Sequence, residues 1–116
     1  MFFSKKKKIT AYLQGVPDTE RTAFDQLLAD YLDGTMKNKL ESLGMTKLEL
    51  YVDWHLSSKS ICLQGRYRQY FADIGIDAEE YFVEFDLDEP DGEVTYPMES
   101  RDAVYQRISD TIRALE

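Results

Sequence analysis

The side chains with the greatest chemical reactivity are a cysteine, a histidine and an aspartate in the middle of the chain. Cys62 and His55 are the single cysteine and the single histidine of the sequence, and Asp53 lies two residues before His55. On one face of a sheet, these side chains could form a thiol nucleophile with its base. A neighbouring carboxylate disfavours the thiolate, however, and a flat sheet offers no oxyanion hole. We therefore expect no catalytic residue, and a protein that is not an enzyme.

A second candidate is the acidic run DLDEPDG at residues 86–92. Carboxylates at alternating positions are typical of calcium loops, but Pro90 occupies the place of the third ligand in the EF-hand spacing. One cysteine and one histidine are too few for a structural zinc site. We therefore expect a solvated loop, no metal and no cofactor, with loose calcium binding as the alternative.

The elements that would position these residues are strands. Apolar residues recur at every second position from Leu48 to Leu56, which predicts a strand with one dry and one wet face. Four strands are predicted, at about 46–56, 59–67, 70–76 and 81–88, joined by two-residue turns at 57–58 and 68–69 and a loop at 77–80. In this register, the two residues of every facing pair point to the same face of the sheet. The inner face becomes the rows Trp54-Ile61-Ile76-Tyr81, Val52-Leu63-Ile74-Val83, Leu50-Gly65-Ala72-Phe85 and Leu48-Tyr67-Tyr70-Leu87.

The turn at 68–69 departs from the usual hairpin sequence, because it lacks the Asn-Gly pair that tight hairpins prefer. The alternative is one bent strand over 59–76, with a bulge at Gly65.

The outer face of the predicted sheet carries charge and aromatic rings. The register places Glu49 opposite Arg66 as a cross-strand ion pair, Cys62 opposite Asp53, and Asp73 opposite Glu84. It also places Phe82 opposite Gly75, where its ring could cover the bare backbone. Two facing carboxylates are destabilising, so folding alone gives no reason for the Asp73–Glu84 pair. A basic partner would relieve that repulsion, and screening by water is the alternative. The candidate partner-binding residues are Tyr51, Asp53, Phe71, Asp73, Phe82, Glu84, Asp86 and Asp88.

Helical patterns flank the strands. A helix is predicted to begin near Asp18 or Thr19 and to end at Gly34, followed by a shorter helix from Thr35 to Gly44. After the strands, a loop is expected that ends near Pro97. Ser100 is then expected to cap a last helix with the stripe Val104, Ile108, Ile112 and Leu115. The fold class is therefore α+β: a two-layer sandwich in which a four-stranded antiparallel meander has the N-terminal helical segment and the C-terminal helix packed on one face. The domain spans residues 17–116, and residues 1–16 form a basic, solvated arm.

The charge of the chain is unevenly distributed. The net charge is −8, from 14 Lys and Arg against 22 Asp and Glu. Lys5 to Lys8 contribute +4, so the remaining 10 basic and 22 acidic residues give the body −12. An acidic body repels nucleic acid and favours a basic protein as partner.

No apolar run approaches the roughly 20 residues of a membrane helix, and four lysines alone would bind anionic lipid weakly, so no stable membrane association is expected. A single cysteine is typical of a reducing compartment, which favours a cytoplasmic protein.

Three functional hypotheses follow. The leading one is a small, acidic, non-enzymatic protein-binding module that inhibits or escorts a basic partner. Immunity proteins that neutralise toxins, antitoxins and secretion chaperones have comparable size, charge and fold class, which is an analogy at that level alone. The second is a small-ligand binder or enzyme subunit with a pocket between helices and sheet, lined by Trp54, Tyr67, Tyr70 and Tyr81. The third is a structural homodimer joined through the sheet face.

Overall fold

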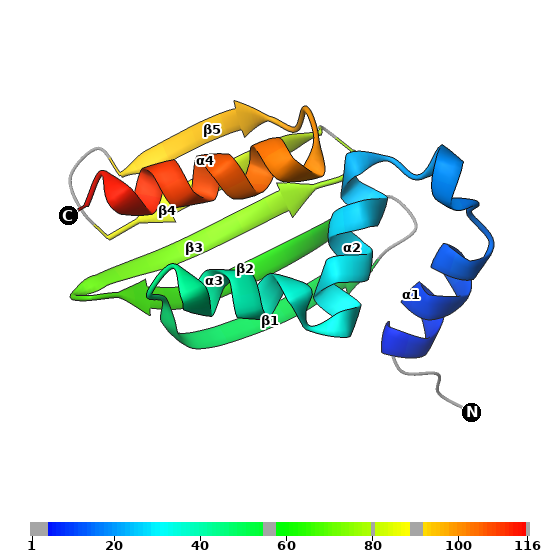
Figure 1. The fold of residues 1–116 in the computed structure, drawn as a ribbon, viewed down its shortest axis with the longest axis horizontal. Coiled ribbons are helices and arrows are strands. Elements are labelled where there is room, and N and C mark those ends of the chain that lie inside the picture. The colour runs from blue at the N-terminus through cyan, green and yellow to red at the C-terminus, as the bar shows by residue number, and fades with distance from the viewer. Residues whose placement is uncertain (1–4, 55–57, 80, 89–91, 116) are drawn as a thin grey trace.

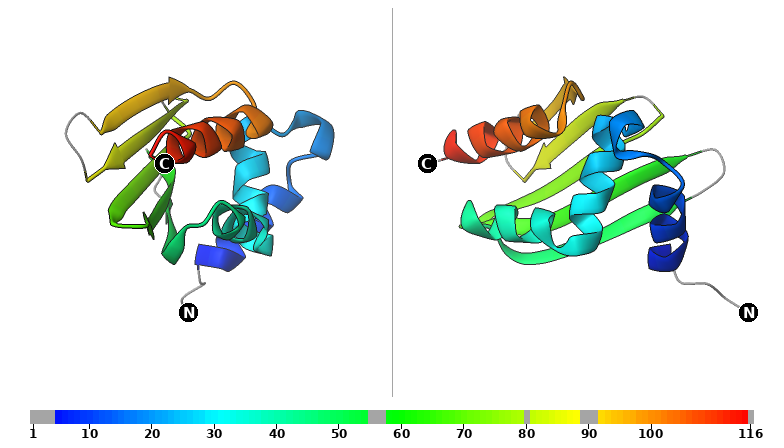
Figure 2. Two further views of the ribbon diagram at one scale, coloured as in Figure 1. Left: turned by 60° about the vertical axis from the view of Figure 1, so that its left-hand side comes forward. Right: turned by 45° about the vertical axis from the view of Figure 1, so that its right-hand side comes forward.

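The computed structural model describes residues 5–54, 58–79, 81–88 and 92–115. Its helices are α1 (Lys5–Gln14), α2 (Ala23–Asp33), α3 (Thr35–Ser42) and α4 (Arg101–Arg113), with a 3₁₀ helix at Asp18–Glu20. Its strands are β1 (Thr46–Trp54), β2 (Lys59–Tyr67), β3 (Tyr70–Asp77), β4 (Phe82–Leu87) and β5 (Glu93–Pro97). Within the described residues they form one antiparallel sheet in the order β1-β2-β3-β4-β5, and α2, α3 and α4 lie on the same side of it (Figure 1, Figure 2). The predicted α+β class is confirmed.

The prediction of four strands is wrong, because β5 follows β4 as a fifth. Val94 pairs with Phe85 and Tyr96 pairs with Val83, where the sequence predicted a loop. The alternation in β5 is only five residues long and ends at a proline, which makes it a weak strand pattern. As a result, β4 is an internal strand and β5 is the edge.

The pairing register is partly as predicted. β2 and β3 pair as expected, with Leu63 opposite Ile74, and the turn at 68–69 is present with Arg68 at φ 55°. The other two predicted hairpins are each two residues out of register, because Ile61 lies opposite Val52 and Ile74 lies opposite Phe85. A slip of two residues keeps every side chain on its face. Most of the predicted inner face is therefore buried or half-buried, but Tyr81 is 37% exposed and several of the predicted pairs are wrong.

The alternative of one bent strand over 59–76 is excluded by that turn. Gly65 has another role, since a Cβ there would stand 2.8 Å from Leu48 Cδ2 and 3.1 Å from Met45 Cε. Glycine thus lets the start of β1, where the register shifts between Thr46 and Glu49, pack closely on β2.

The N-terminal segment is not the solvated arm that the sequence predicted. Residues 5–14 form α1, in which Ile9 and Leu13 are only 1% and 5% exposed. The Nζ of Lys5 donates to the carbonyl of Val52 at 3.3 Å, so α1 also contacts the edge strand β1. The spacing of Ile9 and Leu13 is one helical turn, a short signal next to four consecutive lysines.

The long helix α2 begins later than predicted. Asp18–Glu20 is a separate 3₁₀ turn, and Thr22 caps α2 through a capping box with Asp25. Gly34, at φ 86°, ends α2 as predicted, and Ser100 caps α4 as predicted by accepting from the amide of Ala103 at 3.0 Å.

Two buried carboxylates on α2 fasten the neighbouring helices to it. The Tyr12 hydroxyl donates to Asp25 Oδ1 at 2.8 Å, and the Tyr105 hydroxyl donates to Asp30 Oδ2 at 2.8 Å. Arg101 lies 3.6 Å from the other oxygen of Asp30. Burial and the bond to Asp25 raise the pKa of Tyr12 to about 12, and burial and Asp30 raise the pKa of Tyr105 as well. The buried charges of α2 are therefore partnered, as buried charges must be.

Candidate partner-binding face

The outer face of the sheet is the side that α2, α3 and α4 leave uncovered (Figure 2). Side chains at one register position of the five strands form a line across it, hereafter the acidic row: Glu49, Gln64, Asp73, Asp86 and Glu93. Four of these five side chains are carboxylates. Neighbouring positions in such a row have Cβ atoms roughly 5 Å apart, so the like charges repel one another.

The pairs inside this face differ from the predicted ones. Asp73 lies opposite Asp86 rather than Glu84, and Glu84 lies opposite Gly75. Glu49 lies opposite Gln64, so the predicted pair with Arg66 is absent. The predicted Asp73–Glu84 pair is therefore wrong, although β3 and β4 do carry a facing pair of carboxylates, Asp73 and Asp86.

The acidic row receives little compensation from the described residues. Gln64 Nε2 donates to Asp73 Oδ2 at 3.4 Å, a long hydrogen bond. The salt bridges among the described residues are Arg21–Asp18 and Arg101–Asp30, and neither reaches this face. Asp73, Asp86 and Glu93 thus form no ion pair within the described part of the chain. Their charge is available to an external cation.

The other predicted site residues lie around the acidic row. Tyr51 and Phe82 are exposed, at 42% and 43%, whereas Phe71 is half-buried beneath the Arg66 guanidinium at 6.0 Å. Glu84 and Asp88 are exposed and Asp53 is half-buried. The structure therefore brings all eight predicted residues to the outer face or its rim, which leaves their role in binding a prediction.

A hollow of about 200 Å³ interrupts this face at Gly75. Apart from its two chain neighbours, no described residue has an atom within 4 Å of the position that a Cβ would take there, and Phe82 and Glu84 form part of the wall of the hollow. The sequence predicted that Phe82 covers Gly75, but Phe82 pairs with Asp77 instead. The exposed Phe82 ring and the hollow make the surface of the acidic face uneven, and shape-specific binding requires an uneven surface.

The thiol site is only partly described. Cys62 Sγ lies 4.0 Å from Asp53 Oδ2 and 3.9 Å from Ser60 Oγ, and Tyr51 rather than Asp53 is its strand neighbour. The neighbouring Cys62 is the main cause that raises the pKa of Tyr51. Burial and the charges of Asp73 and Asp53 raise this pKa further. His55 lies outside the described residues, so its predicted place beside Cys62 stays a prediction.

Among the described residues, no group of three or more His, Cys, Asp or Glu side chains could hold a metal ion. Residues 89–91 of the acidic loop lie outside the described part, so the calcium alternative concerns residues on which the structure is silent.

The pocket that the second hypothesis needs is not formed by the four predicted aromatic residues. Tyr67 is buried in the core, and Tyr70 borders a groove near the end of α4. Trp54 stacks edge-on against Tyr12 at 5.2 Å, and the Tyr81 hydroxyl accepts from the amide of Ala23. Trp54 and Tyr81 thus contact the α1–α2 end of the molecule, whereas Tyr70 lies at the opposite end of β3.

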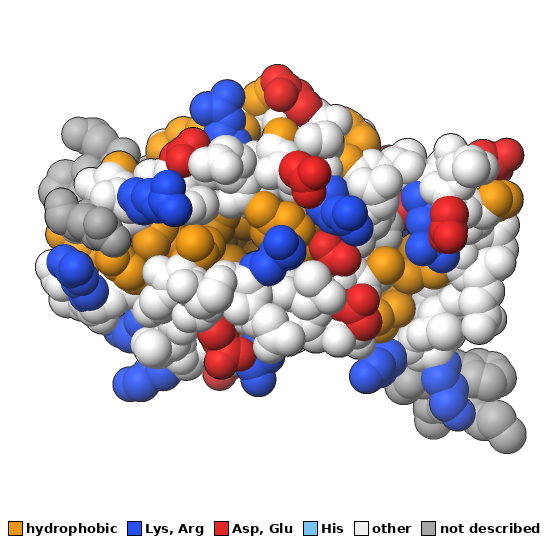
Figure 3. Space-filling model, in the orientation of Figure 1, with side chains coloured by type: hydrophobic (Ala, Val, Ile, Leu, Met, Phe, Trp, Pro, Cys, Tyr) orange, Lys and Arg blue, Asp and Glu red, His pale blue; other side chains and the backbone are white. Residues whose placement is uncertain are grey.

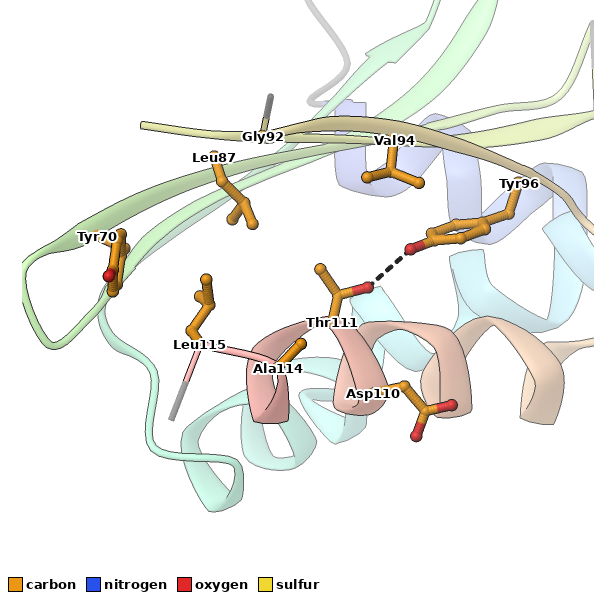
Figure 4. A pocket seen from close by; sticks show the side chains of 9 residues that line it. All are labelled: Tyr70, Leu87, Gly92, Val94, Tyr96, Asp110, Thr111, Ala114 and Leu115. Atoms are coloured by element: carbon orange, nitrogen blue, oxygen red, sulfur yellow. Dashed lines mark hydrogen bonds between the residues drawn. The ribbon is translucent and has the colours of Figure 1, made fainter. Parts of the chain in front are cut away.

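The helix side of the molecule has two grooves of its own. One lies between α3 and α4, with apolar side chains visible along it and both signs of charge around it (Figure 3). The other, of about 400 Å³, lies between β5 and the last turns of α4 (Figure 4). Val94 and Tyr96 point from β5 toward α4, and the Tyr96 hydroxyl lies 2.8 Å from Thr111 Oγ1.

Comparison with known proteins adds no lead: no family model matches the chain, and no curated protein or solved structure is similar enough to count as a match. None of the described helices is both long enough and apolar enough to span a membrane.

Two residues of the acidic row were missed at the sequence level. The predicted register pairs Glu49 with Arg66, and Glu93 falls within the predicted loop, so neither is among the predicted binding residues. The alternation Glu93-Val94-Thr95-Tyr96 was the signal that could have revealed the strand.

Proposed function

We propose that the protein is a non-enzymatic binding module that engages a basic partner protein through the outer face of its sheet. The observation that carries the proposal is the acidic row, which crosses all five described strands of an uncovered face without an ion pair at Asp73, Asp86 or Glu93. A fold that needed only stability would not retain facing carboxylates at Asp73 and Asp86.

Three further features support this proposal. The exposed rings of Tyr51 and Phe82 flank the acidic row, and aromatic residues beside charge are typical of interaction surfaces. The net charge of −8 favours fast association with a positively charged protein. An inhibitory role of the immunity or antitoxin type, or a chaperone-like role, requires nothing more than such a surface.

The homodimer alternative is disfavoured by the same charges. Two copies joined outer face to outer face would bring two acidic rows together, and like charges across an interface are repulsive. The small-ligand alternative needs a pocket lined by the four predicted aromatic residues. These four residues do not form such a pocket, so this alternative lacks its main support.

The test is recovery of a partner from cell extract by three immobilised proteins. The first is wild type, and the second is the face variant (Asp73→Asn, Glu84→Gln, Asp86→Asn). The third is the helix-side variant (Glu20→Gln, Glu41→Gln, Glu99→Gln), whose three exposed glutamates lie on the 3₁₀ helix, α3 and the β5–α4 connection. Each variant changes the net charge from −8 to −5.

We expect wild type and the helix-side variant to retain the same basic protein and the face variant to lose it. Equal retention by all three proteins, or by none, would contradict the proposal. Circular dichroism of each variant establishes that it is folded.

A further inference from the structure

The two edges of the sheet are differently protected. At the β1 edge, Lys5 caps the carbonyl of Val52, and the strand is irregular between Thr46 and Glu49. At the β5 edge, no described residue supplies a hydrogen bond to the outward main-chain groups. An unprotected edge strand is a template for a further strand.

The groups that β5 offers follow from its pairing with β4. Leu87 donates to the carbonyl of Gly92, and Met98 donates to the carbonyl of Tyr81. In an antiparallel ladder, alternate residues face the partner strand, so Val94 and Tyr96 bond to β4. The amides of Glu93 and Thr95, and the carbonyls of Glu93, Thr95 and Pro97, therefore point away from the sheet.

The groove between β5 and α4 lies next to this edge. Val94 is 36% exposed, and with Ala114 and Leu115 it lines the apolar part of the groove (Figure 4). The side chains of an added strand alternate between the two faces, so every second one would lie beside Val94 at the groove mouth.

The remaining side chains of an added strand would lie on the outer face. There they would stand opposite Glu93, at the end of the acidic row, with Glu84 and Asp86 on the next strand. Lysine or arginine at those positions would form the cross-strand pairs that the acidic row lacks. Charge complementarity thus specifies one face of the incoming segment and the apolar groove specifies the other.

We infer that β5 is the docking edge for an extended segment of a partner protein in which basic and apolar residues alternate. The segment adds as a sixth strand, with its basic side chains toward the acidic row and its apolar side chains toward the groove. This inference rests on the proposed function, because it assigns the acidic row to the same partner. A second copy of the chain is a poorer occupant, since it would bring another Glu93 and another acidic row to the joint.

The probe is a synthetic peptide of alternating lysine and valine, Lys-Val-Lys-Val-Lys-Val-Lys with blocked ends, titrated into the full chain. We expect it to bind wild type and to slow hydrogen exchange at the amides of Glu93 and Thr95. A peptide with glutamate in place of lysine should not bind.

The decisive variant is Thr95→Pro. It removes one outward amide while leaving the groups that face β4 in place, so the fold should persist. We expect it to weaken peptide binding about tenfold, the equivalent of one lost main-chain hydrogen bond that leaves a carbonyl of the peptide unpaired. Thr95→Val, which keeps the amide, is the matched control and should bind as wild type does.

Each outcome separates this inference from the proposed function. If Thr95→Pro binds the peptide as tightly as wild type while the face variant does not, the edge inference is overturned and the acidic face stands. If Thr95→Pro loses binding and the face variant keeps it, strand addition stands and the role of the acidic row falls. Absence of peptide binding to wild type, or a wild-type dimer in sedimentation that Thr95→Pro dissociates, also overturns the inference.

Discussion

The two faces of the sheet treat charge in opposite ways. On the helix side, the buried carboxylates Asp25 and Asp30 each accept a hydrogen bond from a tyrosine, and Asp30 also lies near Arg101. On the outer side, Asp73 and Asp86 face each other, and neither forms an ion pair with a described residue. Charge on the helix side therefore stabilises the fold, whereas the facing carboxylates on the outer side repel each other and do not stabilise it.

This comparison predicts the largest contrast for neighbouring residues on β4. Phe85 is fully buried on the inner face, and Glu84 is exposed on the outer face. Phe85→Ala should lower the free energy of unfolding by about 3–5 kcal/mol, because it removes a buried ring and leaves a cavity. Glu84→Ala should change it by less than about 0.5 kcal/mol. Urea denaturation of both variants is the measurement, and similar losses would show that the faces are wrongly assigned.

The next contrast is between two tyrosine hydroxyls. Tyr105→Phe removes the donor to the buried Asp30 and should lower the free energy of unfolding by about 1–3 kcal/mol. Tyr51→Phe, on the exposed outer face, should leave it within about 0.5 kcal/mol of wild type. Thermal and urea unfolding compare the two, and an unchanged Tyr105→Phe would refute the role assigned to Asp30.

A third prediction concerns alkaline pH. Burial and Asp25 raise the pKa of Tyr12 from 10.0 to about 12, so the folded protein keeps a proton that the unfolded chain releases first. The associated stability is fully present below pH 10 and is lost as the pH rises from 10 toward 12. Tyr12→Phe should therefore lose less stability over this range than wild type. Parallel pH slopes in urea unfolding would contradict the assignment.

The smallest effect is expected on the outer face of the free protein. Asp73→Asn should leave stability unchanged or raise it by up to about 0.5 kcal/mol, because it relieves the repulsion from Asp86. Added salt should stabilise wild type slightly more than this variant, since screening acts on a charge that the variant lacks. A clear loss of stability on substitution would mean that Asp73 has a structural partner after all.

The sequence predicts the face to which each strand side chain points better than it predicts which residues pair across the strands. Parity places Leu63 and Ile74 in the core whatever the exact register, because a slip of two residues preserves it. Loop geometry decides the register itself, and the loops carry no strong turn sequence. The inner row that was expected to hold Trp54 opposite Ile61 therefore holds Val52 there, and Trp54 lies half-buried beside Lys59.

The candidate site was predictable in composition but not in layout. All eight predicted residues lie on or at the rim of one face, yet the acidic row also contains Glu49 and Glu93. Their positions depend on the slipped pairing of β1 with β2 and on the short strand β5. Likewise, α1 joins the core through just Ile9, Leu13 and Tyr12, too few residues for the helical periodicity to stand out.

The central claim is that the outer face binds a basic partner, and a titration at two salt concentrations tests it most directly. The partner recovered from extract is titrated with wild type, the face variant and the helix-side variant at about 50 and 500 mM salt. We predict that the face variant binds more weakly and loses less affinity with salt than the other two proteins, chiefly through slower association. Equal affinities and equal salt dependence of the face variant and the helix-side variant would show that this face is merely solvated.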